Sequence, residues 1–405
     1  MSARVRRGLL GAVALGALVL AACGPVAAPA PTPTPTPTPP PPPAANALCE
    51  SAPAPDASDH VAVVKDDDGT TDVVTFEASS ALEVQQEVAE LEKTGDVVTV
   101  EQDRTVQALS VNPGDDPEYA QQYGFTTAFG DYAPAWILGF DGTNVRVAVV
   151  DTGVQANHAD LGPAQVVQGK DFVVSDAASD FGRVDGNGHG THVAGTIVAA
   201  DNTIGVVGGA PKAHVVPVRV LNCAGAGTYS DVANGVLWAS DQTASGGQAK
   251  VINLSLGGSS PSSTLQAALQ TAVSRGVVVV AAAGNGGAGG AALYPAAYPE
   301  AIAVGAVDSL GNIAPYSNTD AYIDVAAAGT LVHSTLNTLG YGDKSGTSMA
   351  TPHIAAIAAL LKQKCPLYTP AQVLARLTAT AGSALPGFVG TVGIAKAGAA
   401  TAAVC

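Results

Sequence analysis

The chain has few charged residues. Lys, Arg, Asp and Glu make up 13% of its 405 residues, about half the usual share. Basic residues are the scarcer kind, 18 against 34 acidic ones, and the formal net charge is −16. Because nucleic-acid-binding proteins hold phosphates with Lys and Arg, this balance excludes a nucleic-acid partner. Aromatic residues, at 5%, are too few for a surface that stacks bases or sugars.

The chain also lacks an apolar run long enough to span a bilayer. Residues 8–20 are apolar and follow Arg4, Arg6 and Arg7, but a spanning helix needs ~20 apolar residues. We therefore predict an export signal over residues 1–22. The sequence Leu-Ala-Ala-Cys that ends at Cys23 resembles a bacterial lipobox, which predicts lipidation of Cys23 and a precursor anchored at the cell envelope. Ordinary cleavage at small residues nearby is the alternative.

The residues that are abundant divide the rest of the chain. Hydrophobic residues make up 47%, enough for a large core, and the length predicts two or three units. Residues 23–57 hold 13 of the 27 prolines, which predicts an extended linker, with a Pro-rich ligand for a partner domain as the alternative.

Residues 58–110 show a strand, helix, strand pattern at 60–64, 80–93 and 97–100, which predicts a small α+β unit. From residue 56 to 110 there are 14 acidic and 3 basic residues.

Residues 111–405 predict one α/β domain, because short β-branched runs alternate with helical patterns. The expected strands are 145–150, 214–220, 250–254, 277–283 and 301–306, and the expected helices lie near 189–200, 229–240, 264–275 and 347–364. This alternation favours a mainly parallel sheet with helices on both faces.

Polar residues follow three of these strands. Asp151 comes directly after the first, Ser255 ends the third and Asn285 follows the fourth. Functional groups of parallel sheets gather at the carboxyl ends of strands, although loops are polar everywhere and coincidence is the alternative. Two helix starts add His189, within Gly-Asn-Gly-His-Gly-Thr-His, and Ser348, within Gly-Thr-Ser-Met-Ala-Thr-Pro. An acid, an imidazole and a hydroxyl are the groups that nucleophilic acyl transfer requires.

Five segments resemble the ordered motifs of the subtilases, in particular their thermitase-like and proteinase K-like branches. They are VAVVDTGVQANHADL, GNGHGTHVAG, SLGG, VVVAAAGN and GTSMATPH, and the match runs from about Asp116 to Leu361. The resemblance implies a subtilisin-like α/β fold and a serine endopeptidase that acts as a monomer on protein or peptide substrates. It assigns Asp151, His189 and Ser348 to a catalytic triad and Asn285 to the oxyanion hole.

The resemblance also implies a binding cleft. Substrate is expected to pair as an added strand with Ser255, Leu256 and Gly257 on one side and with Gly225 and the two residues after it on the other. Residues 281–284 would form the wall of the S1 pocket. Because Leu293 stands where related enzymes have a small residue at the base of that pocket, we predict a shallow pocket that prefers small or medium apolar P1 residues.

Two structural calcium sites are expected from the same resemblance. The main site would use Asp116, Asp160 and Asn202 with carbonyl oxygens of Ala200, Ile204 and Val206; a second, weaker site would use the Pro299 and Ala301 carbonyls with Asp324. The alternative for the first is a turn with surface acids.

Residues 58–110 resemble the propeptide that folds, inhibits and is then cut from these proteases, with cleavage between about 109 and 115. The alternative is an unrelated spacer domain. Cleavage there would release the catalytic domain from the lipid anchor. Among the cysteines we expect a disulfide between Cys365 and Cys405. Some relatives pair a cysteine at the position of Cys223 with another just before the catalytic histidine. This chain has Gly186 there, so we expect Cys223 to keep a free, buried thiol.

Other motifs suggest rival functions. The Gly-rich run 284–289 satisfies GxGxxG, which would suit an NAD-dependent oxidoreductase, but no helix pattern follows it. Asp-Thr-Gly at 151–153 suits an aspartic protease, but a second copy is missing. His189 and His192 have zinc-like spacing without the HExxH glutamate, so we expect His192 to be a packed structural residue. A lipid-anchored binding protein that has lost activity is the rival that is not an enzyme.

Overall fold

The computed structural model describes residues 59–65, 71–102, 115–173, 181–241, 243, 248–402 and 404–405. The expected signal peptide, Cys23, the linker and most of the expected cleavage region lie outside these residues. The chain divides into two compact units with a boundary at Leu109, and each is described by itself. Among the described residues, no helix combines the length and apolar character needed to cross a membrane.

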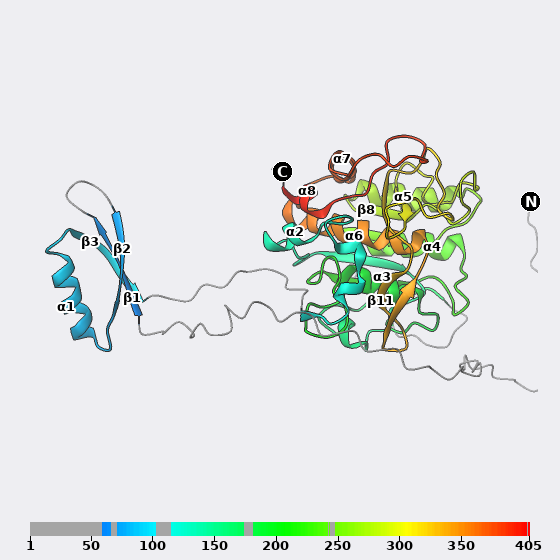
Figure 1. Ribbon diagram of the computed structural model, residues 1–405. Helices are drawn as coiled ribbons and strands as arrows, with labels where there is room; N and C mark the ends of the chain where they lie inside the picture. The colour runs from blue at the N-terminus through cyan, green and yellow to red at the C-terminus, as the bar shows by residue number, and fades with distance from the viewer. Residues whose placement is uncertain are drawn as a thin grey trace, which may run out of the picture. The chain divides into compact units, whose positions relative to one another are not determined.

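The small unit is a three-stranded antiparallel sheet with one helix (Figure 1). Its elements are β1 (Asp59–Lys65), β2 (Thr71–Glu77), α1 (Ala81–Leu91) and β3 (Asp96–Gln102), and β1 pairs with both other strands. Sequence reasoning missed β2, although its Val-Val-Thr-Phe core is typical of a strand. Helix α1 begins after Ser80, whose hydroxyl accepts the Glu83 N–H at 3.3 Å. Leu82, in the first turn of this helix, is exposed.

The large unit is built on a seven-stranded parallel sheet, as the sequence predicts. The strand order is β10-β9-β8-β7-β4-β6-β5. The strands are β4 (Arg146–Asp151), β5 (Lys170–Asp171), β6 (His214–Arg219), β7 (Val251–Leu254), β8 (Val278–Ala282), β9 (Ile302–Val307) and β10 (Val325–Ala328). A separate hairpin pairs β11 (Val332–Thr335) with β12 (Tyr341–Lys344).

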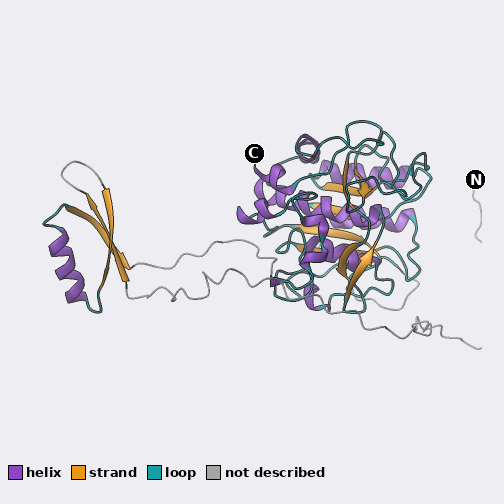
Figure 2. Cartoon of the chain, viewed as in Figure 1, coloured by secondary structure: helices purple, strands orange, loops and turns teal. Residues whose placement is uncertain are grey.

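Helices cover both faces of this sheet, as Figure 2 shows. Helices α3 (His189–Val198) and α6 (Thr347–Lys364) pack on one face with Val147 and Val149, while α4 (Tyr229–Ser240) and α5 (Ser263–Ser274) pack on the other with Ala148 and Val150. Alternate residues of β4 thus enter two separate cores, which is why its four central residues, Val147 to Val150, are all apolar. The remaining helices are α2 (Ala133–Ile137), α7 (Pro370–Ala379) and α8 (Ala397–Ala402).

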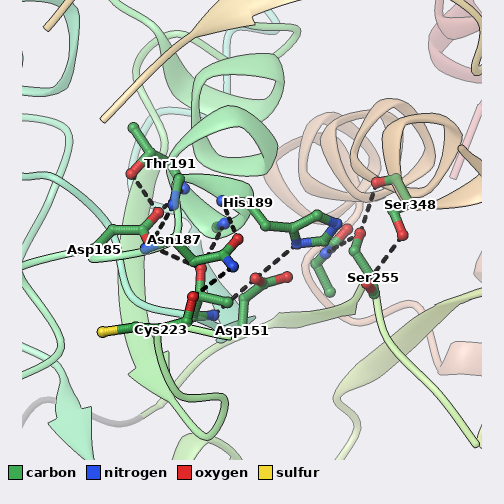
Figure 3. A network of polar contacts seen from close by, with 12 residues as sticks. Asp151, Asp185, Asn187, His189, Thr191, Cys223, Ser255 and Ser348 are labelled. Atoms are coloured by element: carbon green, nitrogen blue, oxygen red, sulfur yellow. Dashed lines mark hydrogen bonds and ion pairs between the residues drawn. The ribbon is translucent and has the colours of Figure 1, made fainter. Parts of the chain in front are cut away.

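Helix α6 is the longest of the described helices and is buried over most of its length. Nearly every residue from Thr347 to Lys362 is buried, which agrees with a sequence that is apolar on most sides. Its N-terminal residue follows Gly346, which has a φ of 153° and offers no side-chain cap. The start of this helix, the start of α3 and the carboxyl ends of β4 and β7 meet in one region of the unit (Figure 3).

Candidate active site

Two of the predicted catalytic side chains are in direct contact. Asp151 is the last residue of β4 and is fully buried, and His189 is the first residue of α3. The Asp151 Oδ1 atom lies 2.8 Å from His189 Nδ1 (Figure 3). This contact places the proton of the neutral imidazole on Nδ1 and leaves Nε2 as the basic nitrogen.

The electrostatic surroundings favour the protonated imidazole. Burial by itself lowers the pKa of His189, but the adjacent Asp151 carboxylate outweighs it, and the pKa lies above its ordinary value. Asp185 acts in the same direction as Asp151, while Lys344 opposes them. A base of raised pKa is suited to take a proton from a hydroxyl and to release it later.

Ser348 lies at the N-terminal end of α6, beside this pair. Its Oγ donates to the carbonyl oxygen of Ser255 at 3.1 Å, so the hydroxyl must turn from that carbonyl before it can donate to His189. Catalytic hydrogen bonds are often incomplete in ligand-free structures and form only with substrate. The Ser255 Oγ donates in turn to the Ser348 carbonyl at 2.8 Å, which ties the end of β7 to the start of α6.

Asn285 is held by one end of its amide. Its Oδ1 accepts the backbone N–H of Thr347 and the Thr347 hydroxyl, both at 2.9 Å. The residue is exposed, so the NH₂ end is presented to solvent next to the serine. A Cβ at Gly346 would lie 3.4 Å from Asn285 Nδ2, an ordinary van der Waals distance, so the amide lies beside the residue that precedes α6.

A cleft of about 490 Å³ adjoins His189. All four predicted substrate-binding residues line it, with Gly225 on one wall and Ser255, Leu256 and Gly257 on the other. Tyr229 and Val232 at the start of α4 complete the first wall. The cleft therefore lies between the turn that contains Gly225 and the segment that follows β7, and a peptide could pair with the backbone between them.

Leu293 lies beside this cleft. The segment that contains it pairs with Gly258, since Gly258 and Tyr294 exchange two backbone hydrogen bonds of 2.8 Å. A Cβ added at Gly257 would come 2.7 Å from Leu293 Cδ2, and one added at Gly284 would come 3.2 Å from Leu293 Cβ. The leucine thus occupies space between the 255–257 segment and the end of the β8 segment.

Comparisons with known proteins agree with this geometry. A profile described as "Subtilase family" matches residues 142–398. The chain belongs to the subtilase family. It is 44% identical over 246 residues to subtilisin DY from Bacillus licheniformis, covering 60% of this chain and 85% of that protein. It is 43% identical over 310 residues to subtilisin amylosacchariticus from Bacillus subtilis subsp. amylosacchariticus, covering 75% of each.

Solved structures show the same relationship. A protease of Pseudoalteromonas arctica PAMC 21717 is similar with a TM-score of 0.64 at 38% identity, covering 71% of this chain and 98% of its own. A cold-adapted subtilisin-like serine proteinase is similar with a TM-score of 0.56 at 40% identity. The protein is a serine endopeptidase with a subtilisin-like fold, which excludes the oxidoreductase and aspartic protease alternatives.

The subtilase brings the residues of the expected main calcium site together. Asn202 Nδ2 donates to Asp160 Oδ1 at 2.9 Å, and the Asn202 N–H donates to Asp116 Oδ1 at 3.3 Å. Two further N–H groups donate to Asp160: that of Ala200 to its carbonyl oxygen and that of Val206 to Oδ2 at 3.1 Å. The Ile204 N–H donates to Asn202 Oδ1. Asp116 and Asp160 are both buried.

One carboxylate of this group has an unused oxygen. Asp116 Oδ2 is buried without a hydrogen-bond partner among the described residues. Burial, with help from neighbouring acids, raises the pKa of Asp116 to about 7. Asp115 and Asp201, which sequence reasoning did not include, place carboxylate oxygens within 4.8 Å of it and of each other. A buried oxygen without a donor, among acids, is suited to a hard cation.

The second expected calcium site has less support. Asp324 Oδ2 accepts the Ala303 N–H at 2.9 Å, and burial raises the pKa of Asp324. Pro299 is exposed and Ala301 is buried. The described contact of the Asp324 carboxylate is with a backbone N–H and not with the other expected ligands. This site therefore stays a prediction.

Several other expectations have clear outcomes. Cys365 and Cys405 form a disulfide, and Cys223 keeps its thiol but is only partly buried.

His192 is buried, and its Nε2 lies 2.9 Å from the Val332 carbonyl oxygen. Burial lowers the pKa of His192 to about 3, so it is a structural histidine. The Gly-rich run after β8 leads to a loop and then to β9, without the helix that dinucleotide binding needs.

Sequence reasoning missed Asp185. This buried carboxylate precedes α3 and accepts hydrogen bonds from Gly188 and Thr191 at the start of that helix. Gly188 has no side chain that could cap the helix. An acidic residue three positions before such a glycine is a signal that could have identified Asp185.

Proposed function

We propose that this serine endopeptidase works through an Asp151, His189, Ser348 triad with the Asn285 amide as an oxyanion donor. The observation that carries the proposal is the 2.8 Å contact between Asp151 Oδ1 and His189 Nδ1, beside a serine at the start of a buried helix. This arrangement leaves His189 Nε2 available as the base for the hydroxyl.

The proposed reaction has two acyl-transfer steps. Ser348 Oγ attacks the peptide carbonyl carbon while His189 Nε2 takes the hydroxyl proton, and Asn285 Nδ2 donates to the oxygen that becomes negative. His189 then gives the proton to the amine as the C–N bond breaks, leaving an ester on Ser348. Water attacks that ester with His189 as base, which releases the acid and restores the hydroxyl. Asp151 stabilises the imidazolium throughout.

A peptide-amide hydrolysis assay tests this mechanism. Ser348→Ala and His189→Ala are compared with the wild type and with Ser274→Ala, which removes an exposed serine at the end of α5. We expect the first two to lose nearly all activity and the control to keep it. Wild-type-like rates in Ser348→Ala would refute the proposed nucleophile.

The proposal extends to substrate and processing. Peptides bind in the cleft between the Gly225 segment and the Ser255 to Gly257 segment. Small or medium apolar side chains are preferred at P1, because Leu293 fills space between the pocket walls.

The 58–110 unit acts as a propeptide that inhibits the enzyme until self-cleavage. The precursor is exported and anchored through lipidated Cys23, and the catalytic domain acts as an extracytoplasmic monomer that is released when the chain is cut between about residues 109 and 115. Mass spectrometry of both termini of the mature protein tests this processing.

We also propose that the subtilase binds structural calcium. Asp116 fits a cation because, among the described residues, its buried Oδ2 has no donor. Hydrogen bonds connect it with Asp160, Asn202, Ala200, Ile204 and Val206, the residues expected to supply the other ligands. The ion would neutralise acids that otherwise repel one another. The weaker site at Pro299, Ala301 and Asp324 is included on the resemblance alone.

A further inference from the structure

One buried carboxylate beside the triad takes no part in the mechanism above. Asp185 is 2% exposed, and its two oxygens accept five hydrogen bonds (Figure 3). Oδ1 accepts the Gly188 N–H at 2.8 Å, the Asn187 N–H at 3.0 Å and the Thr152 hydroxyl at 2.9 Å. Oδ2 accepts the Thr191 N–H at 2.9 Å and the Thr191 hydroxyl at 2.7 Å.

These bonds supply the cap that helix α3 lacks. Its N-cap residue, Gly188, adopts a left-handed conformation with a φ of 90° and has no side chain to accept an N–H. A Cβ there would come 2.5 Å from Asn337 Oδ1, so a larger capping residue does not fit. Asp185 accepts these helix-end N–H groups instead, and its charge lies at the positive end of the helix dipole. The first turn, which begins with His189, is therefore held by Asp185.

The same carboxylate connects this turn to the end of β4. The Thr152 hydroxyl donates to Asp185 and accepts the Gly190 N–H at 3.0 Å. The Thr152 N–H donates to Asp151 Oδ1 at 2.7 Å. A continuous chain of hydrogen bonds thus joins the Asp151 carboxylate, through Thr152, to the backbone on both sides of His189.

The backbone is closely packed around these hydrogen bonds. A Cβ at Gly190 would come 2.2 Å from the Gly153 carbonyl oxygen, so the helix start and the strand end are packed backbone to backbone. Small displacements here change the imidazole position directly, and a misplacement of about 1 Å can cost 10²-fold in rate.

We propose that Asp185 is a positioning residue, which sets the geometry of the Asp151 and His189 pair through Thr152 and the first turn of α3. The proposal rests on the triad proposed above. Asp185 also adds negative charge near His189, whose other charged and titratable neighbours are Asp151, Lys344 and His192.

The test compares Asp185→Asn and Thr152→Val after an added protease, later separated, has removed the 58–110 unit from every variant, because an inactive variant would not process itself. The matched control is Asp141→Asn, which alters another buried carboxylate that accepts the N–H and hydroxyl of Thr143 and pairs with Lys212. The readouts are kcat, KM, the midpoint of the acidic limb of kcat/KM, and Tm. Ser348→Ala runs alongside to report on the triad itself.

We expect Asp185→Asn to lower kcat by about 10- to 100-fold with KM changed less than about twofold. The acidic midpoint moves to lower pH, because removing a negative charge destabilises protonated His189. Thr152→Val lowers kcat but keeps the midpoint, since the charge of Asp185 remains. Asp141→Asn lowers Tm and leaves kcat, KM and the acidic midpoint unchanged.

A purely structural role would give another result. If Asp185→Asn loses Tm but keeps kcat and the midpoint, as the Asp141→Asn control does, the proposal is overturned. If Asp185→Asn does not fold, Thr152→Val decides, and an unchanged kcat there overturns the proposal. Wild-type-like activity in Ser348→Ala would instead count against the triad.

Discussion

In the proposed mechanism Asn285 is an oxyanion donor, and a single substitution can isolate that role. Its Oδ1 accepts from Thr347, which leaves the NH₂ end as the donor, so truncation removes that donor without disturbing the Asp151 and His189 contact. We predict that Asn285→Ala lowers kcat by ~10²–10³ with little change in KM, the loss typical of one oxyanion donor. Steady-state kinetics on a peptide amide measures both constants. A loss confined to KM would show that Asn285 stabilises the bound ground state and the transition state equally, which would contradict its role as an oxyanion donor.

Leu293 sets a second prediction at the residue scale. Because its side chain fills space between Gly257 and Gly284, Leu293→Gly deepens the pocket. We expect the rate with Phe at P1 to rise at least about tenfold relative to Ala at P1, since each buried methylene changes discrimination by about that factor. A P1 peptide library measures the preference. Strong wild-type preference for Phe or Arg would contradict the shallow pocket.

Single residues were predictable from sequence where a strand end or a helix start fixed their place. Asp151, Ser255 and Asn285 follow apolar runs, and His189 and Ser348 stand at glycine-rich helix starts. The resemblance then supplied their roles. Asp185 was not found, because its importance comes from five hydrogen bonds whose donors are defined only when the loop folds over β4.

At the scale of elements, the loop before α3 and the loop after β6 lie close enough to be joined. A Cβ at Gly186 would lie 3.7 Å from Cys223 Cβ, within the usual disulfide range of about 3.5–4.5 Å. We predict that Gly186→Cys forms a disulfide with Cys223 and stabilises the folded state by about 2 kcal/mol. Mass spectrometry detects the bond, and thermal unfolding measures the gain.

A matched control separates the bond from the side chain. Gly186→Ser adds a similar volume without a thiol, and it should show no gain in Tm. If Gly186→Cys keeps two free thiols, or is no more stable than Gly186→Ser, the loops do not lie as the structure has them.

The elements that sequence predicted are those with a strong hydrophobic pattern. Strands β4, β7 and β8 are mostly apolar because both faces of the sheet are covered, and α6 is long and buried. Among the missed elements, β5 has only two residues and β12 reads Tyr-Gly-Asp-Lys, whereas β2 was missed despite its Val-Val-Thr-Phe sequence. Their pairing depends on partners distant in sequence, which a local pattern does not reveal.

At the scale of the whole molecule, the proposed calcium should contribute to stability. We predict that a chelator in excess lowers Tm, because an ion that binds only the folded chain stabilises it by mass action. Differential scanning calorimetry with and without added calcium measures the shift. Asp116→Asn should reduce that shift, whereas Asp141→Asn should keep it. An unchanged Tm in excess chelator would contradict both calcium sites.

The central claim is that Ser348 is a nucleophile activated by His189. Intact-mass and peptide-mapping mass spectrometry of the mature protein after fluorophosphonate treatment tests it most directly, because such reagents modify activated serines covalently. We predict a single adduct on Ser348 in the wild type, strongly slowed labelling in His189→Ala and none in Ser348→Ala. An adduct on another serine, or equal labelling of Ser348→Ala, would contradict the account.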